Sequence, residues 1–458
     1  MNSGLTSRLT SRMPASLAAA LFALSLFATR ANALDMKRVT LSNGAVLLVS
    51  EQHLLPMVTF AIAFDAGSRR DPKGKEGLAD LTADSLTQGT TDLTATEFNQ
   101  KVDFMGSEVS VGAGRDTADA SFTSLKKYED QTLSLLAQIL TNPGLRPADI
   151  ERKRAELVAS INAEEESPHY VAEVTFAKTL FGPDHPYGHP PEGFKETTAK
   201  LTPQDVTEFY HDFYKMSGAV IAVAGDVTVD EIKPKLEKQF ASLQGSVPQQ
   251  PAPPAPAVAP GLHPVLIDQN VAQANVVLGF GGVERSNPDY YKLQVMNHIL
   301  GGGGLTSRLM QEVRTKKGLA YGVGSAFDAG KFPGSFQTIL QTKNKSANEA
   351  IAGVFQQIRA MQEQPVTDDE LSQTKKYLVG SFPLKYDSMG KIDSFMLQVE
   401  LYGLGLDYPE RYPKLVGDVT KDDVLAGAKK YLHPDAAILV VVANQQEAAI
   451  KVDSLLPH

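Results

Sequence analysis

Apolar positions along the chain follow two periods, one typical of strands and one typical of helices. Short apolar runs predict strands over residues 58–64, 109–123 (a glycine-containing pair), 219–224, 274–280 and 436–442, and a hairpin over 41–49 turning at Asn43 and Gly44. Helical spacing covers residues 77–87, 97–105, 128–141, 149–166 and 201–213, and then 291–300, 306–317, 347–362, 367–384, 392–403 and 418–431. Because strands occur both in hairpins and between helix pairs, the pattern predicts the α+β class, with mostly antiparallel sheets backed by helices.

A proline-rich segment, residues 245–261, separates two halves with the same order of elements. It holds six prolines, so it predicts a semi-rigid extended spacer rather than a helix or a central strand. Past it, strand 274–280, its loop and helix 291–300 repeat the order seen from strand 58–64 onward, which indicates an internal duplication. We therefore predict domains over residues 34–244 and 262–458 that face each other across a cleft, and a hinge motion of the spacer is a further hypothesis.

The first 33 residues have the pattern of a secretory signal peptide. Arg8 and Arg12 precede an apolar run over residues 15–28, and Ala31-Asn32-Ala33 supplies a cleavage site. The apolar run is too short to span a bilayer, and no other stretch of the sequence is long and apolar enough. This pattern predicts an exported protein without a membrane span.

Charge and cysteine content narrow the class of partner and the compartment. The formal net charge is −9, and removing residues 1–33 takes away three arginines and no acid, which leaves −12. An acidic chain argues against nucleic acid and anionic lipid as partners. The absence of cysteine excludes disulfides and thiolate metal sites, and it fits an oxidising bacterial periplasm.

The stretch 300–327 carries the most unusual local pattern. It opens with four consecutive glycines, Gly301, Gly302, Gly303 and Gly304, which bring backbone close to something or leave a loop free to close over it. An amphipathic segment follows, and Arg314 and Tyr321 lie seven residues apart across its end. Spacing alone is explained by a surface arginine and a half-buried strand tyrosine, without any functional role for the pair.

Three segments resemble the pitrilysin or insulinase-type metallopeptidases, a family that includes the mitochondrial processing peptidase and bacterial two-subunit proteases. They are the loop Gly67-Ser68-Arg69-Arg70-Asp71, the helix start Glu76-Gly77-Leu78-Ala79, and the run from Arg314 through Leu319-Ala320-Tyr321, and the similarity extends over residues 39–442. The resemblance implies duplicated α+β domains arranged as a half-clamshell. In the catalytic half of such proteins, a helix carries an inverted zinc motif, H-x-x-E-H, and a glutamate about seventy residues later is a third ligand.

The helix that matches this motif lacks the zinc chemistry. Asp80 and Asp84 stand where the family has histidines, and Ala83 stands where it has the glutamate that serves as general base. Alanine cannot accept a proton from water, and two aspartates supply too few ligands for a hard cation. Glu156 and residues 164–166 lie near the third-ligand region and are interpreted as a solvated helix face. We expect no metal in this chain.

The histidines offer no substitute centre. His298, on the matching helix of the second half, has no neighbouring acid and is interpreted as a packing or hydrogen-bonding residue. His185 and His189 lie in a Pro- and Gly-containing loop whose sequence, HPYG, recurs in the resembling family outside the zinc site. No G-x-S-x-G motif and no cysteine are present, which argues against a stand-alone hydrolase with a nucleophile.

The resemblance assigns a role to the second half. In this family the domain without zinc contributes an arginine–tyrosine pair that holds the substrate backbone and stabilises the oxyanion, and Arg314 and Tyr321 match it. The expected function is that of the zinc-less subunit of a heterodimeric periplasmic metallopeptidase. A homologous partner bearing H-x-x-E-H would supply zinc and cleave peptides or unfolded segments, and Gly301 to Gly304 would border the substrate. The alternative is a non-enzymatic peptide-binding or scaffold protein of the same fold.

Overall fold

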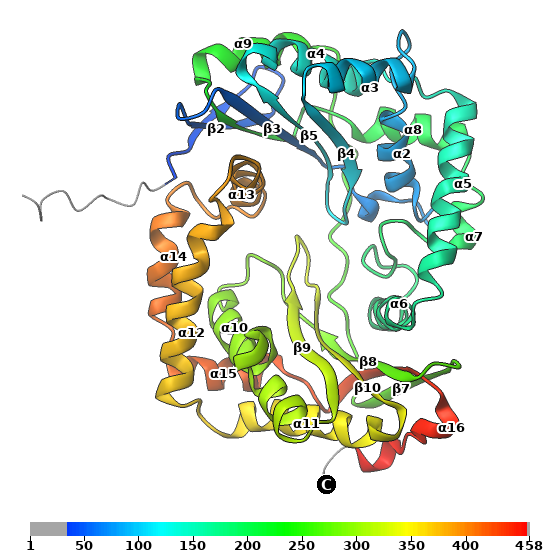
Figure 1. The fold of residues 1–458 in the computed structure, drawn as a ribbon, viewed down its shortest axis with the longest axis vertical. Coiled ribbons are helices and arrows are strands. Elements are labelled where there is room, and N and C mark those ends of the chain that lie inside the picture. The colour runs from blue at the N-terminus through cyan, green and yellow to red at the C-terminus, as the bar shows by residue number, and fades with distance from the viewer. Residues whose placement is uncertain (1–33, 456–458) are drawn as a thin grey trace, which may run out of the picture. The chain divides into compact units, whose positions relative to one another are not determined.

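Two β-sheets organise the chain, one in each half (Figure 1). The computed structural model describes residues 34–455, so the signal-peptide prediction for residues 1–33 lies outside the described residues. The strands of the first sheet are β1 (Lys37–Thr40), β2 (Val46–Glu51), β3 (Met57–Phe64), β4 (Glu108–Ala113), β5 (Ala118–Leu125) and β6 (Val220–Gly225). Those of the second are β7 (Gly261–Asp268), β8 (Gln273–Gly281), β9 (Ala320–Asp328), β10 (Ser335–Lys343) and β11 (Ala436–Ala443).

Apart from the additional edge strand β1 in the first sheet, the two sheets have the same topology, which confirms the predicted duplication. Their strand orders are β1-β2-β6-β3-β5-β4 and β7-β11-β8-β10-β9. In each sheet one neighbouring pair is parallel, β2 with β6 and β7 with β11, and all other pairs are antiparallel. The predicted fold class, α+β with mostly antiparallel sheets backed by helices, is therefore confirmed.

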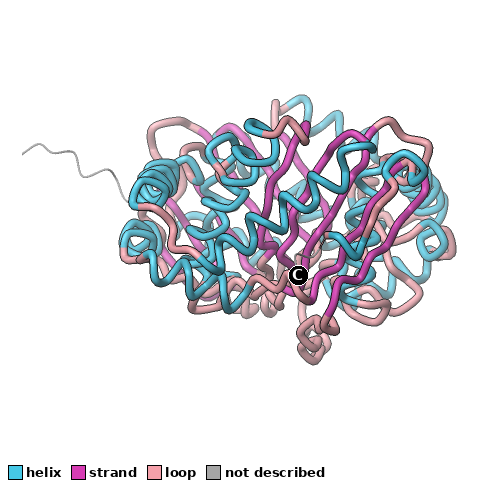
Figure 2. The backbone as a smooth tube through the Cα atoms, turned by 90° about the horizontal axis from the view of Figure 1, so that it is seen from below, coloured by secondary structure: helices cyan, strands magenta, loops and turns pink. Residues whose placement is uncertain are grey.

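Helices make up most of the remaining structure. In the first half they are α2 (Leu78–Leu86), α3 (Ala95–Phe104), α4 (Glu129–Thr141), α5 (Pro147–Glu164), α6 (Pro168–Phe181), α7 (Lys195–Thr198), α8 (Pro203–Phe213) and α9 (Val229–Gln239). In the second half they are α10 (Tyr290–Asn297), α11 (Ala347–Glu363), α12 (Asp368–Ser381), α13 (Met389–Leu401), α14 (Tyr408–Gly417), α15 (Lys421–Tyr431) and α16 (Gln445–Ala448). Seen from below, helices lie across the strands (Figure 2).

Alternation of large and small side chains in β3 gives the first sheet two different faces. Val58, Phe60, Ile62 and Phe64 belong to the main core, together with side chains of α3, α4 and α9. Thr59 and the alanines between them point to the opposite face, where their small size admits a helix at close range. That helix is α13, which comes from the second half of the chain (Figure 1).

The second sheet is covered in the reciprocal way, by α6 from the first half (Figure 1). Phe176 of α6 is buried in a cluster with Val277 of β8 and Val440 of β11. Gly279 is required at this contact, because a Cβ there would lie 2.7 Å from Cζ of Phe176. Each half thus donates one helix to the core of the other, and the domain boundaries predicted from sequence stay a prediction.

Several elements were not predicted, although short signals for them exist. Helix α6 follows Ser167-Pro168, a cap and a first-turn proline, but its apolar residues are not confined to one face. Helix α9 begins with a capping box between Thr228 and Glu231. Strand β7 and helix α14 were also missed, and the helix predicted over 306–317 is instead largely a π-helix, η5 (Met310–Lys316).

The proline-rich spacer is tied to the first half, and its extended conformation stays a prediction. Residues 247–259 have no regular secondary structure. The Gln250 side chain accepts a hydrogen bond of 3.1 Å from the Arg69 guanidinium and donates one of 3.1 Å to the Arg69 carbonyl. Arg70 donates a hydrogen bond of 2.9 Å to the carbonyl of Pro248. His185 contacts the carbonyl of Pro254 at 3.2 Å. Within residues 34–455, no helix is long and apolar enough to cross a membrane.

Candidate functional site

Helix α2, which carries the degenerate zinc motif, is positioned by the loop before it. Both carboxylate oxygens of Asp71 accept backbone hydrogen bonds of 2.8 Å, from Gly77 and from Ala79. Gly77 has a positive φ of 98° and lies against the backbone of Glu192, so no side chain fits there. The family-like loop therefore holds α2 in place even though the motif has changed.

The side chains at the motif form an ion-pair network and not a metal site. Lys153 of α5 lies 3.5 Å from Asp84 and 3.3 Å from Glu156, so an ammonium group supplies the positive charge at this place. Burial, with the nearby charges of Asp84 and Glu192, raises the pKa of Asp80 to about 7. Ala83 is fully buried. Among residues 34–455, no three His, Cys, Asp or Glu side chains are placed to hold a metal ion.

The other ligand-like residues have structural partners. Glu156 is paired with Arg152 at 2.6 Å on the exposed side of α5, in line with a solvated helix face. His185 accepts a backbone hydrogen bond from Tyr187 at 3.0 Å, and His189 contacts the carbonyl of Pro190 at 3.0 Å. His298 stacks on Tyr377 with ring centroids 4.9 Å apart, which makes it a packing residue.

Gly301 and Gly302 end one π-helix, η3 (His298–Gly302), and Gly303 and Gly304 lie between it and a second one, η5. The π-helix is a rare conformation that is frequent at functional sites. Gly301 is buried against β9, and a Cβ there would lie 2.6 Å from the backbone nitrogen of Ser325. Asn297 fixes this approach, because it accepts a hydrogen bond of 2.6 Å from the Ser325 hydroxyl and donates one of 3.0 Å to its carbonyl. Gly304 has a positive φ of 57°. Gly301 is thus a packing glycine, while Gly302 and Gly304 are exposed.

Tyr321 projects from an irregularity in the second sheet. In the register of β9 with β10, Gln341 pairs with Gly322 and Thr342 pairs with Ala320, so Tyr321 is an extra, unpaired residue. Such β-bulges re-aim side chains, and they are common beside active sites. The matching strand of the first sheet, β4, pairs with β5 without a shift from Glu108 to Ala113. The bulge is therefore specific to the strand that carries the tyrosine.

Arg314 and Tyr321 are brought to adjacent elements with their polar groups free. Helix η5 packs against β9 through buried Val313, which accepts a hydrogen bond of 3.0 Å from the amide of Leu319. The Tyr321 side chain is 49% exposed, and Arg314 is exposed as well. In the described part of the chain, neither the guanidinium nor the phenol makes a hydrogen bond or an ion pair. The predicted roles of this pair and of the four glycines stay predictions.

A cavity of about 440 Å3 begins at Gly322, the residue after Tyr321, and neither Arg314 nor Tyr321 is among its lining residues. One wall is the glycine loop, with Gly301, Gly302 and Gly304, and the other is formed by β9 and β10 from Gly322 to Ala326 and at Gln337 and Ile339. Strand β9 pairs with β10 alone within residues 34–455, so its other edge has no strand partner, and there the Ser325 carbonyl already accepts a hydrogen bond from Asn297. A peptide backbone has access here to both donors and acceptors.

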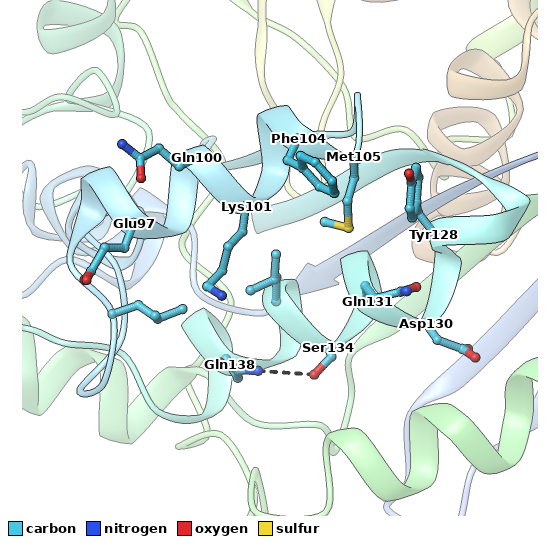
Figure 3. Close-up of a pocket in the computed structure, with 12 residues that line it drawn as sticks. Glu97, Gln100, Lys101, Phe104, Met105, Tyr128, Asp130, Gln131, Ser134 and Gln138 are labelled. Carbon is cyan, nitrogen blue, oxygen red and sulfur yellow. Dashed lines mark hydrogen bonds between the residues drawn. The ribbon is translucent and has the colours of Figure 1, made fainter.

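A larger cavity lies elsewhere, away from the edge of β9. It has a volume of about 940 Å3 and lies between α3 and α4, on the helix layer of the first half (Figure 3). Glu97, Lys101 and Asp130 are charged residues in its lining, and Phe104 is 82% exposed at its rim. Nothing in this lining forms an acid–base or nucleophilic constellation, so size alone does not identify the site.

A partly buried polar cluster joins the two halves and was not predicted. Asp116 accepts hydrogen bonds from the hydroxyl of Tyr187 at 2.6 Å and from the backbone amide of Lys331, in the β9–β10 turn, at 3.0 Å. Arg115 pairs with Asp328 at the end of β9. The strand that carries Tyr321 is thus anchored, at its far end, to the first half. Sequence offers no signal for this cluster, because its members are up to about 200 residues apart and none belongs to a motif.

Comparison with known proteins agrees with this architecture. A family model described as Peptidase M16 inactive domain matches residues 200–378, and one described as Insulinase (Peptidase family M16) matches residues 46–184. The chain is 25% identical over 403 residues to a non-peptidase homolog, YmxG, of Helicobacter pylori, covering 88% of this chain and 92% of that protein. It is 26% identical over 424 residues to an uncharacterized zinc protease of Streptomyces coelicolor, covering 91% and 92%.

Solved structures show the same fold. A peptidase M16 inactive domain from Pseudomonas fluorescens has a TM-score of 0.84 and 27% identity, covering 90% of this chain and 98% of that chain. A protease from Helicobacter pylori has a TM-score of 0.81 and 21% identity, covering 89% and 99%. The similarity therefore extends over both halves.

Proposed function

Since this chain belongs to the M16 peptidase family, we propose that it is the zinc-less subunit of a two-chain metallopeptidase. It is an inactive member of the family, because Asp80, Ala83 and Asp84 occupy the positions of the inverted zinc motif. These residues do not fit zinc: both histidine positions hold aspartate, and Lys153 fills the neighbouring space with a positive charge. Peptide hydrolysis would then depend on zinc held by a homologous partner.

The observation that carries the proposal is the unpartnered Arg314 and Tyr321. A bulge carries Tyr321 and a π-helix carries Arg314, both uncommon backbone features, and Gly322, the next residue after Tyr321, lines the glycine-walled cavity. A phenol hydroxyl can donate a hydrogen bond to an oxyanion, and a guanidinium can hold a peptide carbonyl through several fixed donors. A purely structural pair would be expected to have partners within the chain.

The substrate and the compartment follow from the surroundings of the pair. The open edge of β9 fits an extended peptide that adds a strand, which gives main-chain affinity with little sequence choice. Peptides and unfolded segments are therefore the proposed substrates. The signal-like residues 1–33 and the absence of cysteine support export to the periplasm.

The test is peptidase activity of the chain alone and of the complex it forms with a co-purified M16 partner. We expect chelator-sensitive activity in the complex only. Tyr321→Phe should lower kcat by about 100-fold, the effect of losing one oxyanion donor, and Arg314→Ala should lower kcat/KM. Lys316→Ala, on the same exposed helix, is the matched control and should leave activity unchanged.

Two results would contradict the proposal. An inactive complex, or pair variants that cleave as fast as the parent, would favour a non-enzymatic peptide-binding or scaffold protein. Cleavage by the purified chain alone, insensitive to chelators, would instead indicate a separate catalytic centre. Assembly of each variant with the partner is checked by size-exclusion chromatography.

A further inference from the structure

A second cavity adjoins the glycine loop on the side away from β9. Its volume is about 600 Å3, and it lies between residues 302–306 of the loop and one face of α12. Gly302 and Gly304 line both this cavity and the one beside β9. The glycines between the two cavities carry no side chains. A peptide bound along β9 can therefore place a side chain in the cavity beside α12 by passing over them.

The walls of this second cavity present apolar surface to solvent. Leu305 is 64% exposed and Tyr377 of α12 is 60% exposed, although both are large apolar side chains. The Tyr377 ring is held in place by stacking on His298, at an interplanar angle of 26°. Exposed apolar residues that gather around one hollow, with a ring already oriented, indicate a binding surface.

The ionisable groups around the cavity are either paired with an opposite charge or neutral. The Glu370 carboxylate receives two hydrogen bonds from the Arg308 guanidinium, at 2.7 and 2.8 Å. This pairing holds the pKa of Glu370 below its usual value, so the ion pair is complete at neutral pH. Burial lowers the pKa of His298, which keeps its imidazole neutral. The other polar side chains of the lining, Thr306, Gln373, Thr374 and Tyr377, are uncharged.

We propose that this cavity is a specificity subsite that takes an aromatic or large apolar side chain of a peptide bound beside β9. The inference rests on the proposed function for its ligand class, a peptide. Leu305 and Tyr377 would contact the inserted side chain. Because the walls carry no unpaired charge, they would disfavour a charged side chain. An aromatic residue gains a stacking partner in Tyr377 that an alanine cannot use.

The experiment uses the mature chain without its partner and a set of uncharged ten-residue peptides. The chain contains no tryptophan, so a peptide with one central tryptophan is the sole source of tryptophan emission. Peptides with Phe, Leu, Ala or Lys at the same position are measured by displacement of the tryptophan peptide. We expect a blue-shifted emission on binding and about five- to tenfold weaker binding of the alanine peptide, the size of one stacking contact.

Variants assign the preference to this cavity. Tyr377→Ala should weaken the aromatic peptides about five- to tenfold and leave the alanine peptide unchanged, while Tyr377→Phe should retain the preference. Phe104→Ala is the matched control, because Phe104 is also an exposed aromatic and lies at the cavity between α3 and α4 (Figure 3). Both tested side chains are exposed, so neither substitution removes core packing.

The subsite is overturned if Tyr377→Ala weakens all peptides equally, if lysine is preferred, or if Phe104→Ala abolishes the preference instead. Each of these results leaves the proposed function intact, because that is judged by Arg314 and Tyr321 in the active complex. Absence of binding by every peptide would also overturn the subsite. Peptidase activity of the complex then decides whether the proposed function fails with it.

Discussion

The polar cluster at Asp116 permits a quantitative prediction, tested by replacing Tyr187 with phenylalanine. Tyr187 is fully buried, and its hydroxyl donates to the Asp116 carboxylate at 2.6 Å while accepting from the amide of Phe332 at 3.3 Å. Phenylalanine keeps the ring and removes only the oxygen. The change therefore removes two hydrogen bonds, one within the first half of the chain and one that joins it to the β9–β10 turn.

The expected magnitude follows from the charge on one partner. A hydrogen bond to a charged group contributes about 1.5 to 3 kcal/mol, and a buried donor left unpaired costs about 1 kcal/mol more. The Asp116 carboxylate keeps its hydrogen bond from the amide of Lys331, so its negative charge still has a donor. We expect Tyr187→Phe to lower the free energy of unfolding by about 2 to 3 kcal/mol.

The assay is urea denaturation of the mature chain, followed by far-ultraviolet circular dichroism because the chain has no tryptophan. Tyr321→Phe is the matched control: it removes the same atom from an exposed, unpartnered ring and should change stability by less than about 0.5 kcal/mol. In an Asp116→Asn background, the effect of Tyr187→Phe should fall to about 1 kcal/mol, because the charged acceptor is gone. Equal, small effects of Tyr187→Phe and Tyr321→Phe would refute the reasoning.

Two further predictions concern the degenerate motif and the glycine loop. The pKa of Asp80 is raised to about 7, above its unfolded value, so its ionisation destabilises the fold as pH rises from about 4 to 7, and the penalty is complete above that range. Asp80→Asn should match the parent near pH 4 and exceed its stability by up to about 4 kcal/mol at pH 8; parallel profiles in urea titrations across pH would contradict this. Gly301→Ala should destabilise the chain by about 1 to 3 kcal/mol, because its Cβ meets the backbone of Ser325. Gly302→Ala should lower stability less, because the atom nearest to its Cβ is the side-chain amide of Asn297. The midpoints of thermal unfolding of the two variants test this order.

Local pattern was sufficient for the elements whose signal lies within a short window. The alternation in residues 58–64 predicted β3, the six prolines predicted a segment without helix or central strand, and the repeated order of elements predicted duplicated α+β halves with mostly antiparallel sheets. The change at Asp80, Ala83 and Asp84 is likewise visible in the sequence alone, since it concerns which chemical groups are present. These features depend on composition and periodicity, which neighbouring residues determine.

The features that define the site depended on contacts between distant residues. The exchange of α6 and α13 between the halves, the Asp116 cluster and the cavity walled by the glycine loop and α12 each join segments far apart in sequence. The bulge at Tyr321 exists only in the register of β9 against β10. Sequence by itself therefore determined which groups the chain has and in what order its elements come. Tertiary structure decided which groups face one another, because burial and hydrogen bonding act on the folded arrangement and not on neighbours in the chain.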